Sequence, residues 1–135
     1  MHNISRELIG QIIAIQSKNS KYFISSNQRI LDNSLGLATT EQKGWEKFRV
    51  VQGDDKDFVY LKDCWGKFLS GEKDGRVSQK KDPREWEQFK IWQDDSGNIY
   101  FLNFHGSWLK IGPTGQVFCE SRLNNSAELD IKICD

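Results

Sequence analysis

A strand module of about forty residues, present three times, constrains the fold of this chain more than any other feature. Its middle copy has three parts: Gly-Lys-Phe-Leu-Ser at 66–70, Asp-Gly-Arg-Val at 74–77 and Trp-Glu-Gln-Phe at 86–89. The turn glycines Gly36, Gly75 and Gly115 recur at intervals of about 40 residues, as do Trp45 and Trp86. Three copies favour a closed barrel with threefold symmetry, because a propeller needs at least about four blades and a β-solenoid coil is shorter than this module.

Short strands separated by turns are expected in every copy. Residues 11–16, 58–62 and 98–102 are rich in β-branched and aromatic side chains, and turn-forming residues follow each of them. The Asp-Gly pair at 74–75 predicts a tight hairpin turn, because such a turn needs a positive φ and glycine adopts one without strain. The predicted fold class is therefore all-β.

Alternating apolar side chains predict one shared core. On a strand, residues two apart point to the same face of the sheet. Applied to the three copies, this pattern selects fifteen core side chains: Ile13, Ile15, Phe23, Phe48, Val50, Val59, Leu61, Leu69, Phe89, Ile91, Ile99, Phe101, Leu109, Leu129 and Ile131. Each is expected to contribute about 1.5–3 kcal/mol by leaving water.

The length of 135 residues suits one domain, 1–135, with repeat units at about 11–53, 54–94 and 95–135. Residues 1–10 are mixed and polar, and we expect them to form a loose arm ahead of the first strand. The 19 basic and 19 acidic residues cancel, so no overall field draws the protein to nucleic acid or to an anionic membrane.

Neither a signal peptide nor a transmembrane segment is predicted, because no apolar run approaches the roughly 20 residues of a membrane span. Cys64, Cys119 and Cys134 are odd in number and widely spaced, which disfavours a disulfide framework and a zinc site. We therefore expect a cytoplasmic protein without a metal or other cofactor, in which the cysteines are buried or inert.

The three parts of the module resemble the Gly-Lys-Tyr-Leu, Asp-Gly and Trp-Glu-X-Phe signature of the fascin-like β-trefoil family. The resemblance runs from about residue 11 to residue 133, although the third copy has Ser-Ala-Glu-Leu at 126–129 in place of Trp-Glu-X-Phe. It implies a β-trefoil, in which three pseudo-symmetric four-stranded units form a six-stranded barrel capped by three hairpins. It also implies a class of function, since the family includes proteins that bind and bundle actin filaments.

A basic run on the middle hairpin and in the loop after it is the first candidate site: Lys73, Arg76, Lys80, Lys81 and Arg84. A basic patch suits an acidic partner, and the family resemblance suggests the acidic surface of actin filaments. The acidic residues between these cations are equally consistent with a solvated turn. One trefoil carries one copy of the patch, so filament bundling would need a homodimer or a second site, and both a monomer and a homodimer remain open.

A polar side chain two residues before a ring forms the second candidate site, in two copies: Asp63 with Trp65, and Asn103 with His105. Sugar sites combine an amide or carboxylate that binds hydroxyls with a ring that covers the apolar face of the sugar. The alternative is that both rings pack between hairpins. Carbohydrate binding is therefore kept as the alternative to actin binding.

No catalytic constellation is apparent. His2 and His105 are the only histidines, and no recognised motif places a Ser or Cys beside His105. Residues 112–115 read as a turn and not as a phosphate-binding loop, because no Gly-Lys-Ser/Thr follows them. The sequence thus predicts a non-enzymatic binding protein whose partner is an actin filament or a glycan.

Overall fold

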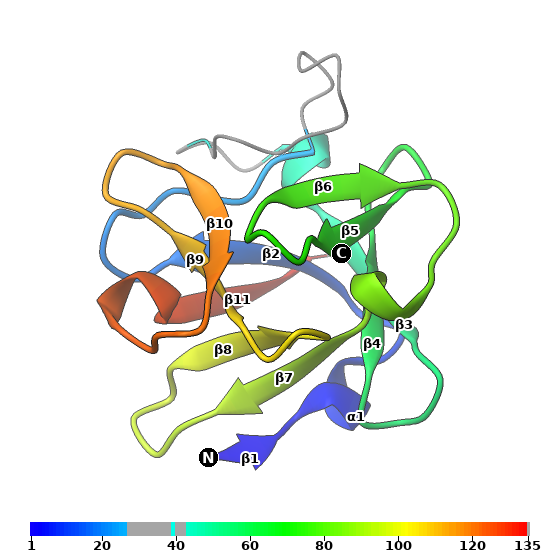
Figure 1. Cartoon of the computed structure of the whole chain (residues 1–135), viewed down its shortest axis with the longest axis horizontal. Helices are drawn as coiled ribbons and strands as arrows, with labels where there is room; N and C mark the ends of the chain where they lie inside the picture. Colours follow the sequence, from blue (N-terminus) through cyan, green and yellow to red (C-terminus); the bar gives the residue numbers. More distant parts are fainter. Residues whose placement is uncertain (27–38, 40–42, 135) are drawn as a thin grey trace.

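The computed structural model describes residues 1–26, 39 and 43–134 (Figure 1). Strands dominate these residues, and the only helices among them are very short. The elements are β1 (His2–Asn3), α1 (Ser5–Leu8), β2 (Ile12–Ser17), η1 (Gly44–Glu46), β3 (Phe48–Gln52), β4 (Val59–Lys62), β5 (Phe68–Gly71), β6 (Val77–Lys80), η2 (Glu85–Glu87), β7 (Phe89–Gln93), β8 (Ile99–Asn103), β9 (Trp108–Ile111), β10 (Val117–Glu120), η3 (Asn125–Ala127) and β11 (Leu129–Cys134). The all-β prediction is confirmed.

Six strands close into a barrel in the order β2, β3, β4, β7, β8 and β11, and β11 pairs back onto β2. Long antiparallel pairings, within β3–β4, β7–β8 and β11–β2, alternate with short contacts. The short contacts fall at equivalent positions of the three modules: Ile13 opposite Phe48, Val59 opposite Phe89, and Ile99 opposite Leu129. This alternation is the threefold arrangement of a β-trefoil barrel, which confirms the predicted fold.

Hairpins cap the barrel. β5 pairs with β6 and β9 pairs with β10, and Figure 1 shows these two hairpins next to each other. In the first module Phe23 and Thr39 form a bridge at the corresponding place, whereas the predicted turn at Gly36 lies outside the described residues. Gly75 has the positive φ expected of the turn, +96°, and a Cβ on it would lie 2.7 Å from the carbonyl oxygen of Cys119. This glycine therefore serves both the turn and the close packing of one hairpin against the next.

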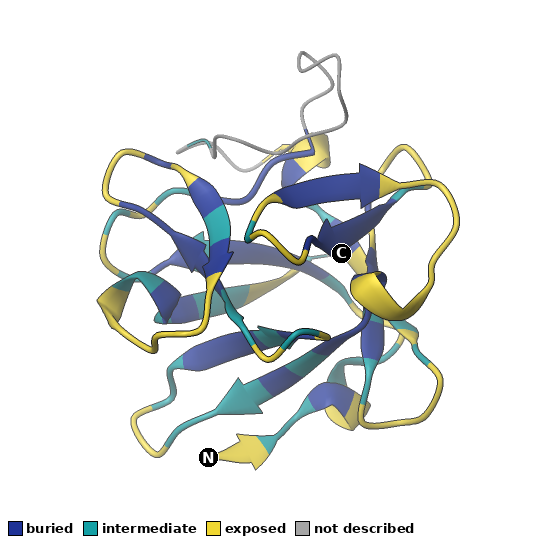
Figure 2. Cartoon of the chain, viewed as in Figure 1, coloured by how far each residue is buried: buried dark blue, intermediate teal, exposed yellow. Residues whose placement is uncertain are grey.

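The core fills the barrel and the space beneath the hairpins, and Figure 2 shows buried residues on the barrel strands and on both hairpins. Thirteen of the fifteen predicted core side chains belong to it. Phe23 is buried outside this cluster, and Ile24 takes the place that Leu69 has in the second module. Phe23 is thus buried as predicted, but the first module has one residue more before this strand, so Ile24 and not Phe23 joins the cluster. Ile131 packs against the cluster but is only partly buried.

The N-terminal residues do not form the expected loose arm. β1 pairs with β7, and the backbone N–H of Ile4 donates to the carbonyl oxygen of Ile91 at 2.8 Å (Figure 1). Ser5 is fully buried, and its Oγ accepts from the backbone N–H of Ile91 at 2.9 Å. β7 pairs with β4 at only a short contact, so backbone groups of β7 need another hydrogen-bond partner. The N-terminal residues provide that partner.

The three cysteines differ in accessibility: Cys64 is exposed, Cys119 is buried and Cys134 is intermediate. Burial raises the pKa of the Cys119 thiol to about 12, against a smaller opposite effect of its hydrogen bond with Asn103. Because the thiolate is the reactive form, we expect a chromogenic thiol reagent to modify Cys64 quickly in the native protein and Cys119 only after unfolding in guanidinium. Cys64→Ser should remove the share of the fast phase that belongs to Cys64, and rapid modification of Cys119 in the native protein would contradict this expectation.

Candidate functional site

The five basic side chains predicted as a partner site are all exposed, on the β5–β6 hairpin and in the loop after it. Two of them have acidic partners within the hairpin. Arg76 Nε lies 2.8 Å from Asp74 Oδ2, and the backbone N–H and guanidinium of Arg76 hold the pKa of Asp74 below its ordinary value. Lys80 Nζ lies 3.3 Å from Glu72 Oε1. Of the five, Lys73, Lys81 and Arg84 form no ion pair with another described residue.

A groove of about 910 Å³ runs beside two of these cations. Its walls are Asp54 and Tyr60 on one side and residues 80–87, which follow β6, on the other. The Tyr60 hydroxyl donates to Asp54 Oδ1 at 3.5 Å, and burial together with the charge of Asp54 raises the pKa of Tyr60. Gln88 Nε2 donates to the other oxygen of Asp54 at 3.1 Å. Internal hydrogen bonds therefore fix this wall of the groove.

The opposite wall is held by the buried side chain of Glu87. Its Oε2 accepts from the Ser70 hydroxyl at 2.6 Å, and its Oε1 accepts from the backbone N–H of Arg84 at 2.7 Å. Glu46 makes the equivalent pair of bonds in the first module. Charge-assisted bonds of this kind are strong, so the Trp-Glu motif anchors residues 80–87 to the hairpin of its own module.

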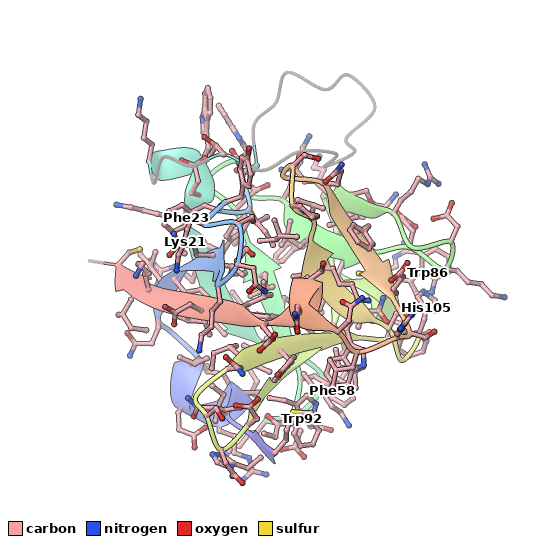
Figure 3. All side chains as sticks on the ribbon, turned by 90° about the vertical axis from the view of Figure 1, so that its left-hand side faces the viewer. Lys21, Phe23, Phe58, Trp86, Trp92 and His105 are labelled. Atoms are coloured by element: carbon pink, nitrogen blue, oxygen red, sulfur yellow. The ribbon has the colours of Figure 1, made fainter. Side chains whose placement is uncertain are left out.

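Trp86 lines the groove and also contacts the loop between β8 and β9. Its ring packs edge to face on His105, with the centroids 4.8 Å apart and the planes at 71° (Figure 3). His105 Nε2 is buried and has no hydrogen-bond partner among the described residues. Phe104 contacts the same imidazole at 5.5 Å, and both Trp86 and Phe104 are substantially exposed, at 38% and 46%. We call Lys81, Arg84, Trp86 and Phe104 the basic–aromatic face.

The two polar side chains of the predicted glycan site are buried in their own loops. Asp63 Oδ1 accepts from two backbone N–H groups of its loop, at 2.9 Å each, and its Oδ2 accepts from the Gln79 side chain. Asn103 Oδ1 likewise accepts from two backbone N–H groups, at 2.9 and 2.8 Å. These oxygens shape the turns, and a sugar hydroxyl would have to displace a backbone hydrogen bond to reach them.

The rings of the predicted glycan site pair with the tryptophans of the preceding module. Trp65 packs on Trp45, with centroids 6.4 Å apart and planes at 33°, just as His105 packs on Trp86. The Trp65 indole N–H also donates to a backbone carbonyl oxygen at 2.9 Å, although 48% of the residue remains exposed. The sequence reasoning missed these pairs. The repeat contained the signal, since Trp45 and Trp86 are equivalent positions and so are Trp65 and His105.

The sequence of this chain matches a model of a known protein family. The family model of the Fascin domain matches residues 25–129, which include both described hairpins and both ring pairs. The chain belongs to the fascin family. No curated protein matches it.

The third module of this fascin domain lacks the Trp-Glu anchor, and a buried lysine takes its place. Lys110 has no exposed surface, and its Nζ donates to Glu120 Oε1 at 2.8 Å. The fully buried Ala127 stands where the other modules have a glutamate, which frees the volume that a lysine stem needs. The ring pair is replaced as well: Asn19 Nδ2 donates to the carbonyl oxygen of Asn125 at 2.7 Å. No sequence pattern marked Lys110 as buried.

The part of the fascin domain that the structure describes holds no group of three or more His, Cys, Asp or Glu side chains suited to a metal ion. None of the described helices is long and apolar enough to cross a membrane. The structure thus groups part of the predicted basic site with exposed rings, and it uses the polar atoms of the predicted glycan site for turns.

Proposed function

We propose that this fascin-family protein is a non-enzymatic actin-binding protein that contacts the filament through the basic–aromatic face. One observation carries the proposal: Lys81 and Arg84 are exposed, lack ion pairs among the described residues, and line the same groove as the exposed ring of Trp86. Membership of the fascin family is what suggests actin as the partner. A cytoplasmic location belongs to the same proposal.

The chemistry of this face suits an acidic protein surface. Unpaired cations at the rim steer an acidic partner and set the register of binding, and Trp and Arg are the residues that most often dominate the energy of an interface. Trp86 is held by its contact with His105 and by the Glu87 anchor, so little side-chain entropy is lost on binding.

The test is co-sedimentation of the purified protein with filamentous actin. The double substitution Lys81→Glu/Arg84→Glu should weaken binding by about tenfold or more, because each reversal replaces an attraction with a repulsion. Binding of the unaltered protein should also weaken as salt is raised from about 50 to 200 mM, since rim charges are screened.

Arg122→Glu/Lys132→Glu is the matched control. It changes the net charge by the same amount at two exposed residues outside the groove, one of them in the corresponding loop of the third module. We expect it to bind filaments as the unaltered protein does. If both double variants lose filament binding equally, the effect comes from net charge alone. If neither loses binding, the basic–aromatic face is not part of the interface.

The carbohydrate alternative has less support at the residues first predicted for it. Asp63 and Asn103 are buried, and His105 packs between Trp86 and Phe104. Trp65 is the one member of that set with a large exposed surface. A sugar site at these positions would therefore rest on a ring without the polar group that usually accompanies it.

A further inference from the structure

We infer that the groove between Tyr60 and residues 80–87 is a binding site for an uncharged saccharide. The site differs from the one predicted in the sequence, and the inference does not rest on actin binding. The groove volume of about 910 Å³ falls in the range of small-ligand sites, which is about 300–1,000 Å³. That volume suits a short oligosaccharide better than a single small ion.

Several charges that line the groove are already satisfied inside the protein. Glu87 is buried and accepts two hydrogen bonds, and Asp54 accepts from Gln88 and Tyr60. Lys80 is paired with an acidic side chain of its own hairpin. These hydrogen bonds occupy oxygens of Asp54 and Glu87 but leave both carboxylates charged, so the groove offers an anionic ligand no excess of positive charge.

Among the exposed groups of the groove without an ion pair in the described chain, cations and anions are equal in number. They are two exposed cations and two exposed anions without an ion pair in the described chain: Lys81, Asp82, Arg84 and Glu85. A small phosphorylated or sulfated ligand enclosed in the groove would lie close to the two free carboxylates, and a small cationic ligand would lie close to the two free cations, whereas a protein partner at the rim can contact the cations alone. Sugar hydroxyls donate and accept, so they can use all four groups without a net electrostatic cost.

The groove also offers the apolar surface that a sugar ring needs. Trp86 is 38% exposed and lines the groove, as does Pro83. The Tyr60 ring also lines the groove; it makes an edge-to-face contact with Phe68 at 5.8 Å, and its hydroxyl makes a long hydrogen bond of 3.5 Å to Asp54. Because both rings are held in place beside hydrogen-bond donors and acceptors, little conformational entropy is lost when a sugar binds.

The experiment is a glycan array probed with the full chain, followed by calorimetric titration of the best uncharged oligosaccharide. Trp86→Ala should weaken its binding by about tenfold or more. Trp45→Ala is the matched control, because Trp45 holds the equivalent position of the first module, is also 38% exposed and does not line the groove. It should leave the affinity within about twofold.

Arg84→Ala is a second variant whose exposed side chain can be removed without opening the core, so the test does not depend on Trp86→Ala folding. It should weaken the same saccharide by about threefold to tenfold through loss of a hydrogen-bond donor. Absence of any uncharged ligand on the array, binding of charged glycans alone, or equal losses with Trp45→Ala would each overturn the inference. Because no actin is present, none of these results bears on filament binding.

Discussion

Phe89→Ala is expected to lower the free energy of unfolding by about 3–5 kcal/mol. Phe89 is fully buried at the start of β7, opposite Val59 of β4 and Asn103 of β8, where three barrel strands meet. Truncation there removes apolar contacts and leaves a cavity that neighbours on three strands cannot close without breaking the barrel pairing. The loss should therefore be close to the full cost of a large core deletion.

Urea unfolding followed by circular dichroism and tryptophan fluorescence measures this loss. Phe104→Ala is the control, since it removes the same ring from a residue that is 46% exposed, and it should change stability by no more than about 0.5 kcal/mol. If Phe89→Ala costs less than about 1 kcal/mol, the residue does not belong to the core that closes the barrel.

Glu120→Ala is expected to cost about 2–3 kcal/mol although the glutamate side chain is 55% exposed. Its partner Lys110 is fully buried, and the bond of 2.8 Å between Nζ and Oε1 is the ion pair that the structure gives to that ammonium. Removing the carboxylate leaves a buried charge without compensation. The expected cost lies below the roughly 3–5 kcal/mol of a fully buried pair, because water reaches the glutamate side.

A rescue distinguishes this mechanism from a general surface effect. Lys110→Met in the Glu120→Ala background should recover most of the stability, since an apolar side chain of similar length needs no partner in the same space. Glu85→Ala, which removes an exposed glutamate without an ion pair in the described chain, should be nearly neutral. The idea fails if Glu120→Ala is as mild as Glu85→Ala, or if the methionine brings no recovery.

The positions of the site residues were less predictable than the fold. The basic run was placed on the correct hairpin and loop, but the sequence did not separate Arg76 and Lys80, which have acidic partners, from Lys81 and Arg84, which have none among the residues that the structure describes. Asp63 beside Trp65 looked like a sugar-binding pair, because the same residue types serve a turn and a ligand site. The carboxylate of Asp63 shapes its turn because backbone N–H groups of its own loop donate to it, and the residue types alone do not show this.

The sequence by itself determined the all-β class, the hairpin turn at Gly75 and nearly all of the core, because strand alternation and turn chemistry act between neighbours in the chain. Only the tertiary structure decided which side chains meet across modules. In the folded protein Trp86 packs on His105, Lys110 is buried beneath η3, and Ser5 is buried against β7. The first contact joins the second and third copies of the repeat, the second lies within the third copy, and the third joins a residue ahead of the repeats to the second copy, so the pattern of residue types along one copy marks none of them.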